Sequence, residues 1–480
     1  MHSPKFQAFF KEHLQIAWIL ALFFLVNLAT LSFYHDIGWD SSVYIGMGKY
    51  IYSMGQSGIW EPIRPLTIPL ILGFFWKIGL DPVIFGKLLI LSFSIGVITL
   101  TYILSTKLFG KQTAIIASII LSFSALLLSV SHEILVEIPA VFFLLSGFYF
   151  YLEKKYFYAG IWLGLAFLTK FPTILLIFAI VGMELLSCVE FRRKFFLIKL
   201  QALSKVLIAF ALIILPYLLF NYYYYHDALL PLKSAKGVID NVVGCTVLDL
   251  KPSHYYFPLL FKDNPLHLFF IFGMSFVLLG KKEKYKINKM QILVYIAAFF
   301  IYFTLLVCKT DRYPILALPF ISVITGYGIS SIYGRIIKKE KYNILIIIII
   351  FLISIFMAGN IIWNNQIPRE NIGIFSYFRE NGISGEILTT TPQIAAFTDS
   401  KLEPIYYYDS SRLAYYMDYI TKNKHGIAYV FVNTGGIPCH PSEPECPRRV
   451  QDFMKFLSSN LKTSYHKKIG GDEYFIFSPI

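Results

Sequence analysis

Charged side chains are scarce in this sequence of 480 residues. Only 15% of them are Asp, Glu, Lys or Arg, whereas 56% are hydrophobic. Soluble domains carry about 25% charged residues, so this chain has too little polar surface to cover a water-soluble core of its size. Apolar runs close to the ~20 residues that cross a bilayer recur instead, at 16–34, 88–104, 210–220 and 342–363. The composition therefore excludes an ordinary soluble protein and predicts a multi-spanning membrane protein.

No cleavable leader is evident in the sequence, and the basic residues form no continuous face. The first apolar run is longer than a secretory leader and no small-residue cleavage site follows it, so we interpret it as a retained span. The net charge of +14 comes from short clusters between the apolar runs, a pattern that sets membrane orientation and argues against nucleic acid as a partner. The clusters lie at 107–111, 153–155, 192–194, 281–284 and 335–341.

Placing the N-terminus and all five clusters in the cytoplasm gives eleven spans by parity. The expected fold class is an all-α polytopic membrane bundle over residues 1–363, followed by a small external α/β domain over 364–480. Segment 66–80 is interrupted by Pro69, Gly73 and Lys77, so it is predicted to be a helix in the outer interface rather than a span. The spans are predicted at 15–34, 85–106, 112–130, 138–152, 157–169, 172–189, 203–221, 265–280, 289–307, 313–333 and 343–363.

Beyond residue 364 charges and prolines appear and the apolar runs shorten. Alternating strand and helix patterns predict a largely parallel sheet on the outer side of the plasma membrane. Cys439 and Cys446 flank a Pro-rich loop there and can pair as a disulfide, with free or metal-bound cysteines as the alternative. The strands are predicted at 386–391, 402–408, 427–432 and 474–478, and the helices at 375–381, 410–422 and 450–461.

Ionisable residues are almost absent from the middle of the predicted spans, where ion-coupled transporters carry theirs. They gather instead where the spans meet the outer surface. Carboxylates and cations at one level suit a substrate with an anionic head and an apolar tail, such as a lipid-linked phosphate. The acidic members are Asp36, Asp40, Glu61, Asp81, Glu133, Glu137, Asp227 and Asp311, and the basic members are Arg64, Lys170, Lys233, Lys236, Lys309 and Arg312.

The first external loop, residues 35–84, is the richest in such residues. A carboxylate in a semi-enclosed pocket can take a proton from an attacking hydroxyl, which makes Asp40 a candidate general base, although an acidic loop residue can also be merely solvated. Arg64 and Arg312 stand at the outer ends of apolar segments and are the first candidates for holding the lipid phosphate.

Two lysines, Lys170 and Lys309, are further candidates for the lipid phosphate. Their alternative role is to extend to lipid headgroups, and the alternative for Arg312 is an ion pair with its neighbour Asp311.

Three motifs in this order resemble the GT-C glycosyltransferases. An acidic residue after the first span precedes Arg64-Pro65-Leu66, the segment 164–172 reads GLAFLTKFP, and Arg312-Tyr313-Pro314 precedes a Leu-Pro pair at 318–319. Within that superfamily the chain resembles the protein O-mannosyltransferase and aminoarabinose transferase group, over roughly residues 15–330. A C-terminal external domain is also usual in that group.

The resemblance implies a polyprenyl- or dolichyl-phosphate sugar donor and transfer on the outer face, in one inverting displacement. Asp40 would be the base, although many relatives carry a second acidic residue where this chain has Ser41. Asp36 takes that role if the register of the loop slips. Glu137 would orient the acceptor or the sugar, with Glu133 as its competitor. The resemblance implies no catalytic metal and no other cofactor, and the acceptor can be a glycan, a lipid or a protein.

Two rival functions remain at this stage. A lipid-linked oligosaccharide polymerase, ligase or flippase would share the lipid phosphate but not the single-sugar donor. A non-catalytic membrane scaffold would only hold the external domain at the membrane. A flippase is expected to carry polar residues at mid-depth, and a scaffold has no need of charges gathered at one level, so the sequence favours a glycosyltransferase over both.

Overall fold

The computed structural model describes residues 4–30, 37–189, 193–241, 243, 247, 249–280, 285–336, 343–364, 374–375, 377–378, 385–406, 410–424, 426–469 and 471–479. By their contacts the residues group into two compact units. The helical unit comprises Met1–Tyr34, Leu88–Leu229 and Pro252–Gln366, and the mixed unit comprises His35–Lys87, Leu230–Lys251 and Ile367–Ile480. Residues 35–87 thus share a unit with the C-terminal region, whereas the division by composition at residue 364 separates the two.

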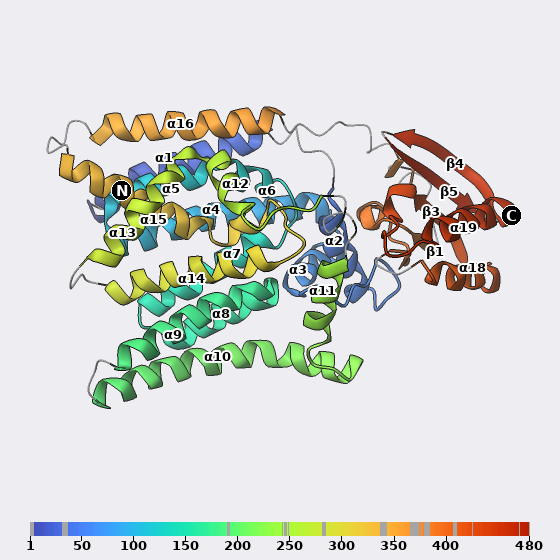
Figure 1. Ribbon diagram of the computed structural model, residues 1–480, viewed down its shortest axis with the longest axis horizontal. Helices are drawn as coiled ribbons and strands as arrows, with labels where there is room; N and C mark the ends of the chain where they lie inside the picture. Colours follow the sequence, from blue (N-terminus) through green and yellow to red (C-terminus); the bar gives the residue numbers. More distant parts are fainter. Residues whose placement is uncertain are drawn as a thin grey trace. The chain divides into compact units, whose positions relative to one another are not determined.

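The regular elements in the described residues of the helical unit are helices. Figure 1 shows most of them lying side by side with similar axes. Each predicted span range holds a helix. The longer helices are α1 (Pro4–Thr30), α4 (Pro82–Phe109), α5 (Lys111–Ser122), α6 (Ala125–Ser131), α7 (Glu137–Leu152), α8 (Tyr156–Thr169), α9 (Ile174–Val189), α10 (Arg193–Tyr225), α12 (Tyr256–Asp263), α13 (Phe270–Leu279), α14 (Lys286–Leu305), α15 (Leu318–Ile336) and α16 (Asn343–Asn364). Short 3-10 turns precede α9, α13 and α15, at Phe171–Thr173 (η2), Pro265–Phe269 (η4) and Tyr313–Leu316 (η5).

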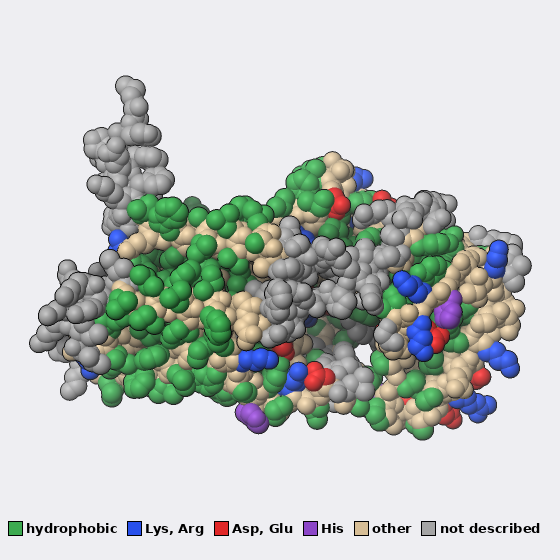
Figure 2. Space-filling model, turned by 90° about the horizontal axis from the view of Figure 1, so that it is seen from above, with side chains coloured by type: hydrophobic (Ala, Val, Ile, Leu, Met, Phe, Trp, Pro, Cys, Tyr) green, Lys and Arg blue, Asp and Glu red, His purple; other side chains and the backbone are tan. Residues whose placement is uncertain are grey.

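Small residues let these helices approach closely. A Cβ on Gly160 of α8 would lie 2.2 Å from the carbonyl oxygen of Val206 in α10, and one on Gly273 of α13 would lie 1.9 Å from that of Ile324 in α15. Glycine at such crossings is typical of helix packing in membranes. Figure 2 shows hydrophobic side chains over most of the visible face of the helical unit, as contact with lipid requires.

The number of spans is not established by helix length. Among the described residues, three helices are long and apolar enough to cross a membrane: Pro82–Phe109, Leu197–Tyr225 and Lys286–Leu305. A fourth span results if α5 and α6, which meet at a bend of 57°, count as one. The further apolar stretches within helices, among them Leu14–Thr30 of α1 and Leu345–Asn360 of α16, are 10 to 17 residues long. The eleven-span count therefore stays a prediction, although the helices occupy the predicted ranges.

Three helices of the mixed unit come from outside the C-terminal region: α2 (Trp39–Tyr52), α3 (Thr67–Lys77) and α11 (Leu230–Asn241). The segment predicted as an interfacial helix at 66–80 is indeed helical, as α3. It buries Ile68 and Leu72 and exposes Leu70 and Phe74. Its depth in the membrane stays a prediction.

The C-terminal sheet is mixed, so the expectation of a largely parallel sheet is wrong. The strand order is β2-β1-β3-β5-β4, with β1 parallel to β2 and β3, and β5 antiparallel to β3 and β4. Strand β4 was not predicted, because its sequence KTSYHKKI is polar and lacks an apolar alternation. The strands are β1 (Glu386–Thr389), β2 (Leu402–Pro404), β3 (Ile427–Asn433), β4 (Lys462–Ile469) and β5 (Asp472–Ser478).

Alternation along the strands gives the sheet two apolar faces. Leu388, Val430 and Phe477 share one hydrophobic cluster with residues of α18 (Arg412–Lys422) and α19 (Cys446–Asn460). The other cluster joins Ile387 to Ile59 of the loop at residues 35–84. That loop therefore supplies part of the core of the C-terminal region.

Cys439 and Cys446 form a disulfide with a Cα–Cα distance of 5.6 Å. The bond closes the Pro-rich loop before α19. Cys245 lies outside the described residues.

Candidate active site

Asp40 lies in the first turn of α2, directly after Gly38 and Trp39. An acidic side chain is favourable there because the N-terminal end of a helix carries a partial positive charge. Asp40 is only 9% exposed, so it is not the solvated loop residue that composition alone would suggest. The alternative base, Asp36, lies outside the described residues.

Arg64 holds two carboxylates at once. Its Nη2 atom is 2.6 Å from Oδ1 of Asp40, and its Nε atom is 3.1 Å from Oε2 of Glu61. The guanidinium also lies over the ring of Tyr44, with Cζ 5.6 Å from the ring centroid. Such charge-assisted contacts to a planar guanidinium fix both position and orientation. These four residues together with Tyr406 are called the Arg64 cluster.

Glu61 is the most deeply buried acid of the Arg64 cluster. Burial raises the pKa of the Glu61 carboxyl above its ordinary value, which Arg64 and a hydrogen bond from Tyr406 oppose. The hydroxyl of Tyr406 donates to Oε1 of Glu61 at 2.8 Å. The sequence counts Glu61 among the acids at the outer surface but gives it no role, and it does not single out Tyr406 at all.

A second cluster is centred on Glu137 in the helical unit. Glu137 begins α7 and is 1% exposed. Its Oε1 atom lies 2.6 Å from Nζ of Lys170 and 3.2 Å from Nε of Arg312. Lys170 follows the end of α8, and its Nζ atom is 4.9 Å from the centroid of the Tyr313 ring. The Glu137 cluster, comprising these four residues, thus brings together three residues that the sequence proposed separately.

The contacts of Arg312 and Lys170 bear on the alternatives weighed for them. Arg312 pairs with Glu137, 175 positions earlier, while its neighbour Asp311 accepts a hydrogen bond from Tyr255. Lys170 likewise contacts a buried carboxylate, which a lysine extended to headgroups would not do.

Lys309 contacts the backbone, and Glu133 lies just before α7. Nζ of Lys309 donates to the carbonyl oxygen of Leu306 at 2.6 Å, and burial lowers the pKa of its ammonium. Glu133 is half-buried in the turn between α6 and α7. Their expected roles at the phosphate and at the acceptor stay predictions.

In the part of the chain that the structure describes, no group of three or more His, Cys, Asp or Glu side chains gathers as metal ligands would. The expectation that transfer proceeds without a metal stays a prediction.

Residues 63–220, about a third of the chain, match the family model for the dolichyl-phosphate-mannose-protein mannosyltransferases. This range includes Arg64, Glu137 and Lys170. A search of curated protein sequences finds no match.

Similar folds are found among solved structures. ArnT from Cupriavidus metallidurans, bound to undecaprenyl phosphate, aligns with a TM-score of 0.64 and 11% identity, over 98% of either chain. The Archaeoglobus fulgidus oligosaccharyltransferase in the apo form aligns with a TM-score of 0.61 and 12% identity, over 88% of this chain and 70% of that one. The A. fulgidus oligosaccharyltransferase AglB, in complex with an inhibitory peptide and a dolichol-phosphate, aligns with a TM-score of 0.57 and 13% identity. The alignment covers 88% of this chain and 69% of that one. At these identities the likeness is one of fold.

Proposed function

We propose that this chain, a GT-C membrane glycosyltransferase of the dolichyl-phosphate-mannose-protein mannosyltransferase family, moves a sugar from a polyprenyl-phosphate donor to an acceptor hydroxyl. Transfer takes place on the outer face of the membrane. The observation that carries the proposal is the buried carboxylate of Asp40, held by Arg64 at the start of α2. The ArnT structure supports the choice of donor, because that protein has the same fold and was solved with undecaprenyl phosphate.

Asp40 acts as the general base in this proposal. The acceptor hydroxyl gives its proton to the Asp40 carboxylate while its oxygen attacks the anomeric carbon of the sugar. The bond from that carbon to the phosphate oxygen breaks, and its electron pair leaves on the lipid phosphate. One displacement of this kind inverts the anomeric configuration.

Cations stabilise the phosphate as it leaves with its growing negative charge. Arg312 and Lys170 are suited to this because both already bind the carboxylate of Glu137, and a phosphate oxygen competes for the same donors. The Arg312 side chain is 28% exposed, so a ligand can reach it. Arg64 and Lys309 are assigned to the same phosphate chemistry, and Glu137 to orienting the sugar or the acceptor.

Transfer by the purified protein tests the proposal. The protein is incubated with undecaprenyl- and dolichyl-phosphate monosaccharides and with hydroxyl acceptors of glycan, lipid and peptide type. We expect release of lipid phosphate and a product of inverted anomeric configuration, read by NMR. A retained configuration would exclude the single displacement. Transfer only from lipid-diphosphate oligosaccharides would instead support an oligosaccharide transferase or polymerase.

A further inference from the structure

We propose that Tyr406 of the C-terminal region is a positioning residue for Asp40, acting through Glu61 and Arg64. The inference rests on the proposed function, because it takes Asp40 as the base. Tyr406 follows β2 and is separated from Glu61 by 345 positions in the chain. All the residues involved belong to the mixed unit.

A continuous series of polar contacts leads from Tyr406 to Asp40. The Tyr406 hydroxyl donates to Oε1 of Glu61 at 2.8 Å, and Oε2 of Glu61 is 3.1 Å from Nε of Arg64. Nη2 of Arg64 is 2.6 Å from Oδ1 of Asp40. Because Glu61 and Arg64 each use two different atoms, one for each neighbour, a shift at Tyr406 changes the orientation of both. We call this series the Tyr406 relay.

The Tyr406 ring also packs against the residue that precedes Asp40. It packs edge-on against the indole of Trp39, with ring centroids 4.8 Å apart, and Trp39 directly precedes Asp40. Tyr406 is itself buried, at 6% exposure. One side chain therefore constrains Asp40 both through the relay and through the neighbouring residue.

The backbone near the relay is joined to the same part of the sheet. The amide of Gly58 donates to the carbonyl oxygen of Ser400 at 2.9 Å, and the amide of Leu402 donates to that of Gly58 at 2.8 Å. Gly58 therefore continues the sheet beside β2, three residues before Glu61. These two bonds fix the distance between the loop and the segment that carries Tyr406.

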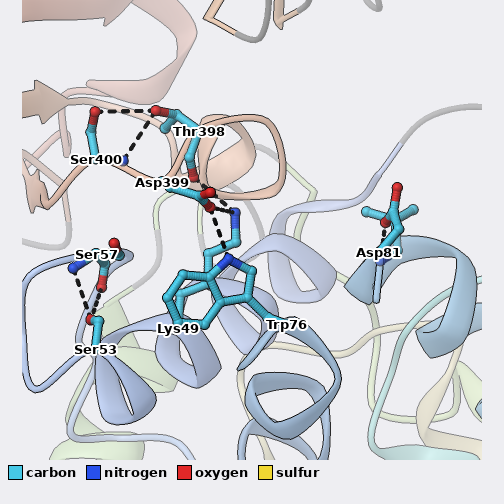
Figure 3. Close-up of polar contacts among 9 residues, drawn as sticks. Lys49, Ser53, Ser57, Trp76, Asp81, Thr398, Asp399 and Ser400 are labelled. Atoms are coloured by element: carbon cyan, nitrogen blue, oxygen red, sulfur yellow. Dashed lines mark hydrogen bonds and ion pairs between the residues drawn. The ribbon is translucent and has the colours of Figure 1, made fainter. Parts of the chain in front are cut away.

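A buried lysine anchors the other end of α2. Nζ of Lys49 donates to the carbonyl oxygen of Thr398 at 2.8 Å and lies 2.9 Å from Oδ1 of Asp399 (Figure 3). The indole of Trp76 in α3 donates to the same carboxylate oxygen at 3.0 Å. Both helices of the loop are thus attached to the segment before β2, so the C-terminal region supports the loop at several points.

Loss of the Tyr406 hydroxyl changes the electrostatics of Glu61, which a loss of packing alone would not do. Asp40, Arg64 and Tyr406 are the charged and titratable groups that act on Glu61. The Tyr406 hydrogen bond lowers the pKa of the Glu61 carboxyl, so its removal makes Glu61 take up a proton at higher pH. Once Glu61 is protonated, Asp40 is the remaining carboxylate of the cluster that pairs with the Arg64 charge. Stronger pairing makes the Asp40 carboxylate less basic, so it accepts the proton of the acceptor hydroxyl more slowly.

Tyr406→Phe in the full-length protein tests the relay, with Tyr416→Phe as the matched control. Tyr416 is also buried in the C-terminal region, and its hydroxyl donates to the carbonyl oxygen of Pro404 at 2.9 Å. We expect Tyr406→Phe to lower kcat on the order of tenfold on the acid side of the profile and to move the acid limb of kcat to higher pH. Tyr416→Phe should leave the shape of the profile unchanged.

Infrared titration of the Glu61 carboxyl gives a readout that needs no sugar donor. The protonated band, assigned by its loss in Glu61→Gln, should appear at higher pH in Tyr406→Phe than in wild type or Tyr416→Phe. An unchanged midpoint, or a kcat lowered by one factor at every pH, overturns the relay. A shifted midpoint in a protein that transfers no sugar supports the relay and overturns the proposed function.

Discussion

At the scale of single residues, Asp40 and Arg64 form a largely buried ion pair. The Asp40 side chain is 11% exposed and the Arg64 side chain 15%. A buried carboxylate of this kind contributes both to the proposed chemistry and to stability. The sequence suggested a loop acid near water, for which a substitution would cost the fold little. The structure therefore changes the expected result for stability, because Arg64 would lose one of its two anionic partners.

Asp40→Asn should lower the rate of sugar transfer by about 10²–10⁴, since an amide cannot accept the acceptor's proton. The free energy of unfolding should fall by about 1–2 kcal/mol, because the contact with Arg64 becomes that of a neutral group. Transfer assays and melting temperatures of the purified variant measure both effects.

Asp418→Asn is the control for this change. It removes one charge from another ion pair of the mixed unit, that with Lys422 in α18, and has no part in the proposed chemistry. Near-normal turnover by Asp40→Asn would remove Asp40 from the base role. Loss of turnover in Asp36→Asn alone would assign that role to Asp36.

Arg312→Ala should weaken binding of a polyprenyl-phosphate analogue. Loss of a charge-assisted contact costs about 1.5–3 kcal/mol, which is roughly one to two decades in affinity. Arg312→Lys should also weaken it, because the planar fork is lost. The measurement is a binding titration of the detergent-solubilised protein.

Arg335→Ala provides the comparison for that titration. Arg335 lies in the last turn of α15, with its guanidinium carbon 4.5 Å from the centroid of the Phe276 ring. Its removal should leave analogue binding unchanged. Equal affinity of Arg312→Ala and wild type would show that Arg312 serves only to hold Glu137.

The sequence singles out candidate site residues whose position along the chain carries a signal, and their roles stay predictions. Asp40, Glu137 and Arg312 each stand next to a predicted span, and the structure places them at the starts of helices or turns. Tyr406 and Lys49 carry no such signal. Their partners are more than 340 positions away, and one tyrosine among 33 is not distinguished by its neighbours.

At the scale of elements, α2 and α3 pack with their backbones almost in contact. A Cβ on Gly48 would lie 2.6 Å from the amide nitrogen of Gly73 and 2.6 Å from the carbonyl oxygen of Pro69. A backbone atom cannot move aside as the end of a flexible side chain can. The close approach keeps the start of α2, where Asp40 lies, in place relative to α3.

Gly48→Ala should therefore separate the two helices. Overpacking of this kind costs about 1–3 kcal/mol, and the displaced Asp40 should also lower the rate of transfer. Thermal unfolding and transfer assays measure the two effects together. Gly182→Ala in α9 is the control, since a Cβ there meets no atom within 4 Å. A Gly48→Ala protein as stable and active as wild type would contradict this account of the packing.

Element boundaries follow the hydrophobic pattern wherever that pattern is strong. The helices of the helical unit coincide with the apolar runs, and β1, β2, β3 and β5 coincide with short apolar stretches. Strand β4 is paired only with β5 at the end of the sheet, and most of its side chains are exposed. Such an edge strand can be polar and lysine-rich, so its sequence does not reveal it.

At the scale of the whole molecule, the membrane topology can be tested in intact cells. Cys439 and Cys446 should react with a membrane-impermeant thiol reagent only after reduction of their disulfide, because the C-terminal region is predicted to face outward. A variant with both cysteines replaced by Ser supplies the background. Labelling that requires permeabilised cells would overturn the eleven-span count, since parity would then place the C-terminal region inside.

The pairing of Gly58 with the edge of β2 limits how this protein can be modified or recombined. The C-terminal sheet takes its last backbone partner, and Ile59 of its core, from a segment encoded more than 300 residues upstream. A C-terminal fragment expressed alone would present an unpaired strand edge and an uncovered apolar face, the features that promote aggregation. We therefore expect exchange of this region between relatives to succeed only when residues 35–84 are exchanged with it.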